Sequence, residues 1–272
     1  MANQSRTIAI FGQYKTGTTA LFSQIRDALP ADTIALMEPS QYRPGWRDGK
    51  HPVLAKVILA LYEGPGRVHY DHFTGFDHKI FLVRDPRDRL VSGILFTAQQ
   101  NPAVYGSPDK LARVLDLFAR KSAEPRKMSF RELAAEVLKE AGGKSLPEVM
   151  EELQAHHRWI YDFDERLHGH FRLRYRDFID RRLSALEDYL GLPLPTDVKI
   201  DPQHNHVIRT RQYGDWKNWF LAEDVEYFRP FTEEYLRHYG FEEDWEINPN
   251  PVIPPEHSVE YVRRTVGKRN RN

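Results

Sequence analysis

The stretch that decides the fold class is Ile8-Ala-Ile-Phe-Gly-Gln-Tyr-Lys-Thr-Gly-Thr-Thr-Ala-Leu21. It is typical of a short buried strand, a turn with two glycines and the start of an amphipathic helix. Gly12 and Gly17 have the spacing of the phosphate loop G-x-x-x-x-G-K-[ST], but Thr18 stands where that motif has its lysine. A lysine occurs three residues earlier, at Lys15. The stretch therefore predicts a strand–loop–helix unit with a modified phosphate loop.

The physical properties of such a loop favour an anion. A helix N-terminus presents unpaired N–H groups and roughly half a positive charge, and glycines let the backbone approach a phosphate closely. Thr18 and Thr19 add hydroxyl groups at the helix start, and Lys15 projects from the loop itself. We therefore expect an anion here; the alternative is an ordinary strand-to-helix turn without a ligand.

The composition is that of a soluble globular protein. Lys and Arg number 39, as do Asp and Glu, so the net charge of zero argues against a general nucleic-acid binder. No apolar run approaches the roughly 18 residues of a membrane span. The N-terminus lacks the hydrophobic segment of a signal peptide. Because there is no cysteine, no disulfide framework exists, and we expect a reduced, cytoplasmic setting.

Strand and helix patterns alternate along the chain. Further apolar runs predict strands at 33–37, 53–59, 79–84 and 171–175. This alternation predicts an α/β fold with a central, mostly parallel sheet flanked by helices. In such sheets ligands bind beyond the carboxyl ends of the strands.

The domain boundaries follow from changes in pattern. Helical stretches at about 108–121, 129–141 and 146–165 predict a helical insertion over residues 100–165 that lies beside the sheet. We expect one domain over 1–246, followed by a Pro-rich, basic tail over 247–272 that is frayed and solvated.

Two polar residues stand at or near the ends of predicted strands. Glu38 ends the second strand, where Pro39 fixes a turn, and would point into the same crevice as the 12–19 loop. It could instead be an exposed carboxylate or a partner of Arg43 or Arg47. Lys56 interrupts the third apolar run, which indicates either an edge position or a charge that faces an anion.

The junction after the fourth strand is a second candidate anion site. Asp85 is a good N-cap and Pro86 suits the first helical position. Arg84 ends the strand and Ser92 lies two turns into the helix, so both could face an anion. The alternative for Arg84 is a salt bridge to Asp88, which follows Asp85 at the spacing of a capping box.

Three histidines lie at 69, 72 and 78. Their spacing does not match a zinc motif with other ligands, so we expect exposed or hydrogen-bonded imidazoles and no metal site.

Four stretches together resemble the sulfotransferases that use 3′-phosphoadenosine 5′-phosphosulfate (PAPS). In the family's order they are Tyr14-Lys-Thr-Gly-Thr-Thr19, Val83-Arg-Asp-Pro-Arg-Asp-Arg-Leu-Val-Ser92, Leu173-Arg-Tyr-Arg-Asp177 and Gly214-Asp-Trp-Lys-Asn218. The resemblance implies transfer of a sulfuryl group from PAPS to a hydroxyl of a carbohydrate or other small-molecule acceptor. The product nucleotide would be adenosine 3′,5′-bisphosphate, and no metal is implied.

The resemblance also implies roles for single residues. Lys15 and Lys56 would lie near the sulfuryl group, and Tyr175 would reach the adenine. The 5′-phosphate would be held by the backbone and hydroxyls of Thr16, Gly17, Thr18 and Thr19. The 3′-phosphate would be held by Arg84, Ser92 and Arg209, and the donor site would be closed by the box that contains Gly214, Trp216 and Lys217.

The resemblance offers two possible positions for the catalytic base, because branches of the family differ in this residue. Cytosolic members have a histidine two residues after the strand lysine, where this chain has Ile58. Other branches use a glutamate at the end of the second strand, so we predict Glu38 as the general base, with His69 or His72 as the alternative. Arg209-Thr210-Arg211 also departs from the family's Arg-Lys-Gly, which affects the geometry of that loop.

Two other functions remain open from the sequence. One is a phosphate-loop kinase, against which the position of Lys15 and the absence of an obvious magnesium-binding acidic motif argue. The other is a nucleotide-binding module without activity. The acceptor depends on residues 39–52 and 100–165, which contain no recognisable specificity motif.

Overall fold

The computed structural model describes residues 6–43, 46, 49–60, 68–197 and 209–269. It divides into two compact units, which we describe separately. Unit 1 comprises residues 1–84 and 156–204, and unit 2 comprises residues 85–155 and 205–272. The predicted single domain over 1–246 therefore stays a prediction.

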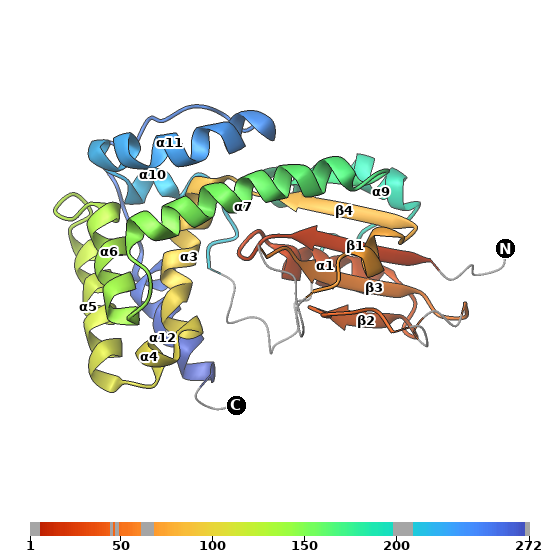
Figure 1. Cartoon of the computed structure of the whole chain (residues 1–272), viewed down its shortest axis with the longest axis horizontal. Helices are drawn as coiled ribbons and strands as arrows, with labels where there is room; N and C mark the ends of the chain where they lie inside the picture. Colours follow the sequence, from red (N-terminus) through yellow and green to blue (C-terminus); the bar gives the residue numbers. More distant parts are fainter. Residues whose placement is uncertain (1–5, 44–45, 47–48, 61–67, 198–208, 270–272) are drawn as a thin grey trace. The chain divides into compact units, whose positions relative to one another are not determined.

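Unit 1 is built on a five-stranded parallel sheet (Figure 1). Its spatial order is β2-β3-β1-β4-β5. The strands are β1 (Thr7–Gly12), β2 (Ile34–Met37), β3 (Val53–Ile58), β4 (His78–Val83) and β5 (Phe171–Arg174). All of the predicted strands are confirmed to within one residue at each end, and so is the α/β fold.

The two faces of the sheet are covered by different helices. On one face, Leu21, Phe22 and Ile25 of α1 (Thr18–Ala28) pack in one buried cluster with Ile10 and Leu54. On the other face, the ring of Phe11 lies 5.3 Å from that of Phe163 in α7 (Leu146–Arg166). Because successive side chains of a strand point to opposite faces, each strand contributes to both packing layers. Unit 1 also contains α2 (Asp71–Thr74), α8 (Tyr175–Ile179) and α9 (Ser184–Leu190).

The register of the sheet brings the candidate residues together at the carboxyl ends of the strands. Gly12 pairs with Ile58, and Met37 pairs with Lys56. The residues after β1 and β2 therefore leave the sheet beside the end of β3. Since β3 lies between β2 and β1, Lys56 occupies an interior strand, and the edge-position alternative for this lysine is wrong.

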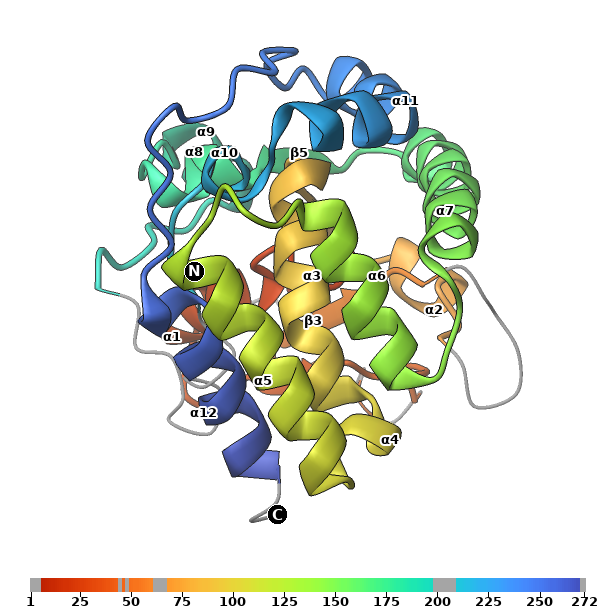
Figure 2. The ribbon, with the colours of Figure 1, turned by 90° about the vertical axis from the view of Figure 1, so that its left-hand side faces the viewer.

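Unit 2 is helical. The prediction of helices over 100–165 is confirmed, and Figure 2 shows α3, α5, α6 and α12 side by side. The helices are α3 (Pro86–Gln100), α4 (Pro102–Tyr105), α5 (Pro108–Ala123), α6 (Phe130–Ala141), the first part of α7, α10 (Trp216–Trp219), α11 (Ala222–His238), the 3₁₀ turn η3 (Pro255–His257) and α12 (Val259–Arg269).

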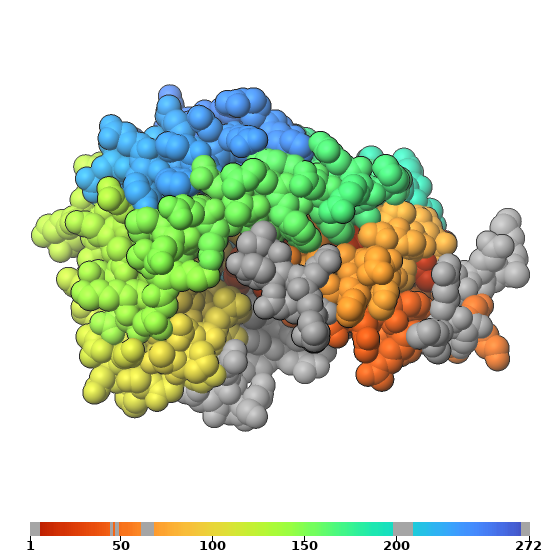
Figure 3. Space-filling model, in the orientation of Figure 1, coloured from red at the N-terminus to blue at the C-terminus, as the bar shows by residue number. Residues whose placement is uncertain are grey.

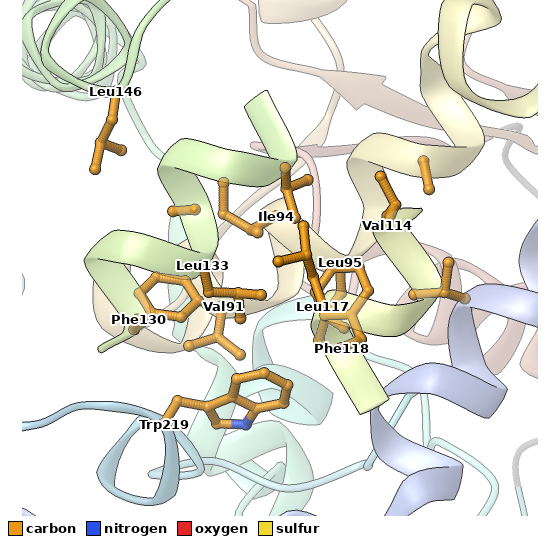
Figure 4. Packing of buried hydrophobic residues seen from close by; sticks show 14 of the residues in the cluster. Val91, Ile94, Leu95, Val114, Leu117, Phe118, Phe130, Leu133, Leu146 and Trp219 are labelled. Carbon is orange, nitrogen blue, oxygen red and sulfur yellow. The ribbon is translucent and has the colours of Figure 1, made fainter. Parts of the chain in front are cut away.

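One hydrophobic core joins these helices. Val91 and Leu95 of α3 meet Phe118 of α5 and Leu133 of α6, all without solvent exposure, and Figure 4 shows them with Trp219. A capping box begins α6: the Ser129 hydroxyl accepts from the Glu132 amide, and the Glu132 carboxylate accepts from the Ser129 amide. The ion pair Arg113–Glu140, at 2.8 Å, links α5 to α6, which lie in the yellow to green part of Figure 3.

The predicted frayed tail is wrong over residues 259–269. These residues form α12, whose apolar positions recur at helical spacing and enter the core of unit 2: Val259, Tyr261, Val262 and Val266. The basic residues of this stretch suggested a solvated end, but Arg263 and Arg264 are exposed on the outer face of an amphipathic helix. None of the described helices is both long and apolar enough to cross a membrane.

Candidate anion-binding site

The loop between β1 and α1 is held in an unusual backbone conformation. Lys15 has a φ of +66° and Gly17 a φ of +95°, both in the left-handed region. The hydroxyl of Thr16 is fully buried and donates to the carbonyl of Gln13 at 2.7 Å. A Cβ on Gly12 would lie 2.6 Å from Thr18 Cγ2, so glycine is required there. The hydroxyl of Thr16 therefore holds the loop together, which leaves only its backbone for a ligand.

The N-terminus of α1 is open. Gly17 is its N-cap residue, and no side chain caps this end of the helix. Within the described residues, the amides of Thr18 and Thr19 have no protein acceptor. The first amides of a helix need a partner from outside the helix, and together they attract an anion.

Tyr175 and Arg84 pack against the loop and hold its backbone. A Cβ on Gly17 would lie 2.5 Å from Cε2 of Tyr175, so this ring packs directly against the glycine. The guanidinium of Arg84 lies 4.4 Å from the centre of the same ring, and its Nη1 donates to the carbonyl of Lys15 at 2.9 Å. In this arrangement Tyr175 is a buried support of the loop; its predicted contact with adenine stays a prediction.

Arg84 keeps an unsatisfied donor. The residue is only 6% exposed, and its Nε is buried without a hydrogen-bond partner in the described part of the chain. A buried donor without an acceptor is unfavourable by about 1–3 kcal/mol. A ligand acceptor would remove this penalty, and a guanidinium next to an open helix N-terminus favours an anionic one.

Lys56 joins the loop to Glu38. Its Nζ donates to Oε1 of Glu38 at 2.7 Å and to Oγ1 of Thr19 at 2.8 Å, while the Glu38 amide donates to the Lys56 carbonyl at 3.0 Å. Burial lowers the pKa of Lys56, and the carboxylate of Glu38 partly offsets this effect. Glu38 is thus an exposed carboxylate, as one alternative had it, and its ion-pair partner is Lys56; Arg47 lies outside the described residues.

Glu38 itself stays accessible. Its side chain is 45% exposed, whereas that of Lys56 is 4% exposed. Glu38 also has a φ of +54°, a conformation that non-glycine residues rarely adopt. A carboxylate at the open end of the sheet, oriented by a buried ammonium, is suited to take a proton from a bound hydroxyl group.

Tyr14 is a further residue of the loop that the sequence did not single out as a candidate. The residue is 48% exposed, and partial burial of its hydroxyl, followed by the charge of Glu38, raises its pKa. The signal was present: an aromatic residue directly before Lys15, in a loop otherwise made of small and polar residues.

The remaining predicted site residues belong to unit 2. Ser92 is buried in α3, and Trp216 packs with its ring 4.2 Å from the guanidinium of Arg87. Lys217 forms an ion pair with Asp244. Gly214 has a φ of +75° and begins the turn that leads into α10.

Arg209 is the second buried arginine with unsatisfied donors. Its side chain is 4% exposed, and its Nη1 lies 2.5 Å from Oδ2 of Asp215. Within the described residues its Nε and Nη2 are buried and have no hydrogen-bond partner.

Asp88 has a different role from the predicted capping box. Asp85 caps α3 by accepting from the Arg87 amide at 2.9 Å. The fully buried carboxylate of Asp88 accepts instead from the amides of Gly214 at 2.7 Å and Trp216 at 3.1 Å. Its main partners are therefore distant in sequence.

The histidines do not form a convincing metal site. His69, Asp71 and His72 offer ligand atoms within 4.8 Å of one another, but all three residues are exposed. Nδ1 of His72 accepts from the Tyr42 amide at 3.2 Å, which leaves the hydrogen of a neutral imidazole on Nε2. A metal would have to displace this bond, so we assign no metal to the cluster; that His69 or His72 is the base stays a prediction.

Comparison with known proteins supports the fold. No family model matches the chain, and no curated protein does. Among solved structures, the chain is similar to mouse sulfotransferase SULT7A1 complexed with PAP, with a TM-score of 0.50 and 16% identity over 85% of each chain. At this identity the likeness is one of fold, so the chain has a sulfotransferase-like α/β fold.

Proposed function

We propose that the chain is a sulfotransferase that moves the sulfuryl group of PAPS to a hydroxyl of a carbohydrate or other small molecule. The observation that carries the proposal is the presence, beside one loop, of two groups suited to anions: an uncapped helix N-terminus and the buried, incompletely paired guanidinium of Arg84. The fold and the four sequence stretches give this anion site its nucleotide context.

Different residues of the loop bind the 5′-phosphate and the sulfuryl group of the donor. The amides of Thr18 and Thr19 and their hydroxyls hold the 5′-phosphate, with Thr18 in the place where a nucleoside-triphosphate loop has its lysine. Lys15, on the loop itself, contacts the sulfuryl or leaving-group oxygens. By the resemblance, Arg84 serves the 3′-phosphate, and Ser92, Arg209, Gly214, Trp216 and Lys217 keep the roles that the sequence predicts.

Transfer needs a base and a cation at the reacting group. Glu38 takes the proton of the acceptor hydroxyl while the hydroxyl oxygen of the acceptor bonds to sulfur. The bond between sulfur and the 5′-phosphate oxygen breaks in the same step, and adenosine 3′,5′-bisphosphate leaves. Lys56, already 2.7 Å from Glu38, orients the carboxylate and offsets negative charge. Positioning and charge stabilisation thus account for the catalysis, as in phosphoryl transfer.

The donor class is tested by ligand-induced stabilisation. Adenosine 3′,5′-bisphosphate at 100 times its dissociation constant should raise the free energy of unfolding by about 2.7 kcal/mol. ATP with magnesium at the same concentration should do less. Stronger stabilisation by ATP and magnesium would favour a kinase and contradict the proposal.

Two variants connect this result to the site. Arg84→Met should lose about tenfold or more in bisphosphate affinity, because a charged hydrogen bond contributes about 1.5–3 kcal/mol. Arg26→Met is the matched control: it removes the same charge from the last turn of α1, opposite the loop. Acceptors are then screened with donor labelled in its sulfate, with Lys15→Ala as the blank.

A further inference from the structure

Asp88 lies near the start of α3 but does not cap this helix. It lies in the first turn of α3, where Asp85 already supplies the cap. It is completely buried, and its two oxygens accept from the amides of Gly214 and Trp216 at 2.7 and 3.1 Å. Burial of a carboxylate is unfavourable unless hydrogen bonds compensate for the lost water. The carboxylate therefore fixes the backbone on both sides of Asp215.

Asp215 in turn holds Arg209. Oδ2 of Asp215 accepts from Nη1 of Arg209 at 2.5 Å and from the indole Nε1 of Trp219 at 3.1 Å. Trp219 is fully buried, so it anchors this carboxylate in the core of unit 2. Two successive links thus lead from Asp88, through the backbone at 214–216 and the side chain of Asp215, to the guanidinium of Arg209.

Arg209 ends this series with donors that lack acceptors. Nε and Nη2 are buried and have no hydrogen-bond partner among the described residues, although the side chain is only 4% exposed. The two groups lie on one edge of the planar guanidinium, the edge that binds phosphate oxygens in a bidentate manner. Such an edge fits an anion with two acceptor oxygens.

We propose that Asp88 is a positioning residue for the phosphate-binding guanidinium of Arg209, acting through the 214–216 backbone and Asp215. The inference rests on the proposed function, which makes the anion the 3′-phosphate of the donor nucleotide. Asp88 does not touch the phosphate; it fixes the turn from which Asp215 orients the fork of Arg209.

The experiment compares two nucleotides that differ only in the 3′-phosphate. Calorimetry on the full chain gives the affinities for adenosine 3′,5′-bisphosphate and adenosine 5′-phosphate, and their ratio is the preference for the 3′-phosphate. Arg209→Met should reduce this preference about 10- to 100-fold, the equivalent of one charged hydrogen-bonded contact. Asp88→Asn should reduce it at least about fivefold, with less than a twofold change in affinity for the 5′-phosphate.

A double variant separates positioning from general damage. If Asp88 acts through Arg209, Asp88→Asn has no further effect on the preference once Arg209→Met is present. Val137→Ala, a buried truncation in α6, is the stability control, because it loosens the core of unit 2 while the residues of the 214–216 turn and Asp88 stay unchanged. It should leave the preference unchanged. If Asp88→Asn does not fold, Asp88→Glu, which keeps the charge but displaces it, is measured in the same way.

Each outcome decides something. An unchanged preference in Asp88→Asn, an equal loss for both nucleotides, or an effect that persists in the Arg209→Met background overturns the inference alone. A wild-type chain that binds both nucleotides equally contradicts the proposed function and, with it, the inference.

Discussion

The packing of Tyr175 against Gly17 predicts an unusually large effect of a single methyl group. Gly17 has a φ of +95°, where an L-residue is disfavoured by about 1–2 kcal/mol. In Gly17→Ala the new Cβ would also lie 2.5 Å from Cε2 and 2.8 Å from Cδ2 of Tyr175, so the ring must move. Its cation–π contact with Arg84, worth about 0.5–2 kcal/mol, would weaken as it moved. The expected destabilisation of unit 1 is therefore about 2–4 kcal/mol.

Gly191→Ala isolates the backbone part of this effect. Gly191 follows α9 with a φ of +57°, and a Cβ there would meet nothing within 4 Å. It belongs to the same unit, so both variants are compared by urea unfolding, with hydrogen exchange of the β1 and β3 amides reporting on unit 1. Gly191→Ala should lose only the conformational term, about 1–2 kcal/mol.

The contact with the ring is then tested by a double-mutant cycle. In a Tyr175→Ala background, Gly17→Ala should be no more destabilising than Gly191→Ala, because the obstructing ring is gone. If Gly17→Ala equals Gly191→Ala in the wild-type background, the argument that Tyr175 supports the loop is refuted.

Three further predictions concern single side chains. Burial lowers the pKa of Lys121 to about 8, so between pH 8 and about 10.5 the unfolded chain holds a proton that the folded chain has lost. Over this range the free energy of unfolding of the wild type should therefore rise relative to that of Lys121→Met, by up to about 3 kcal/mol. Parallel curves of unfolding free energy against pH would contradict this. Glu38→Gln should lower kcat about 10²- to 10⁴-fold and change bisphosphate affinity little, as single-turnover assays and calorimetry would measure; an unchanged kcat would exclude Glu38 as the base. Thr16→Val should lower the free energy of unfolding by about 1 kcal/mol, because the carbonyl of Gln13 loses its buried donor, whereas no change in a urea titration would mean that the hydroxyl is dispensable.

Local chemistry accounts for the parts of the fold that the sequence predicted. The strands are continuous apolar runs bounded by turn residues, and the start of α3 follows from an N-cap aspartate and a proline, so neither depends on distant partners. The same holds for the glycines of the 12–19 loop. Residues 259–269 were mistaken for a solvated end because prolines and charges outweighed a helical pattern of only four apolar positions.

Long-range partners account for the parts that it did not. Asp88 has the spacing of a capping residue, but its hydrogen bonds go to a turn 126 residues away. Glu38 meets Lys56 because the register of β2 and β3 pairs Met37 with that lysine, and no local pattern predicts this register. The packing of the Tyr175 ring against Gly17 in the 12–19 loop likewise depends on how β5 joins the sheet.

The support of the loop by Tyr175 has a consequence for how the protein is made. The loop is translated early, whereas its supporting ring belongs to the last part of unit 1, after the chain has passed through residues 85–155 of unit 2. Contacts between such distant segments form slowly, because a long intervening chain must first be ordered. During synthesis, the nascent chain would therefore carry the complete 12–19 loop before the ring that supports its conformation has been translated. If the loop binds the nucleotide as proposed, this affinity would arise only after β5 had joined the sheet, so ligand capture would report the completion of folding on the ribosome.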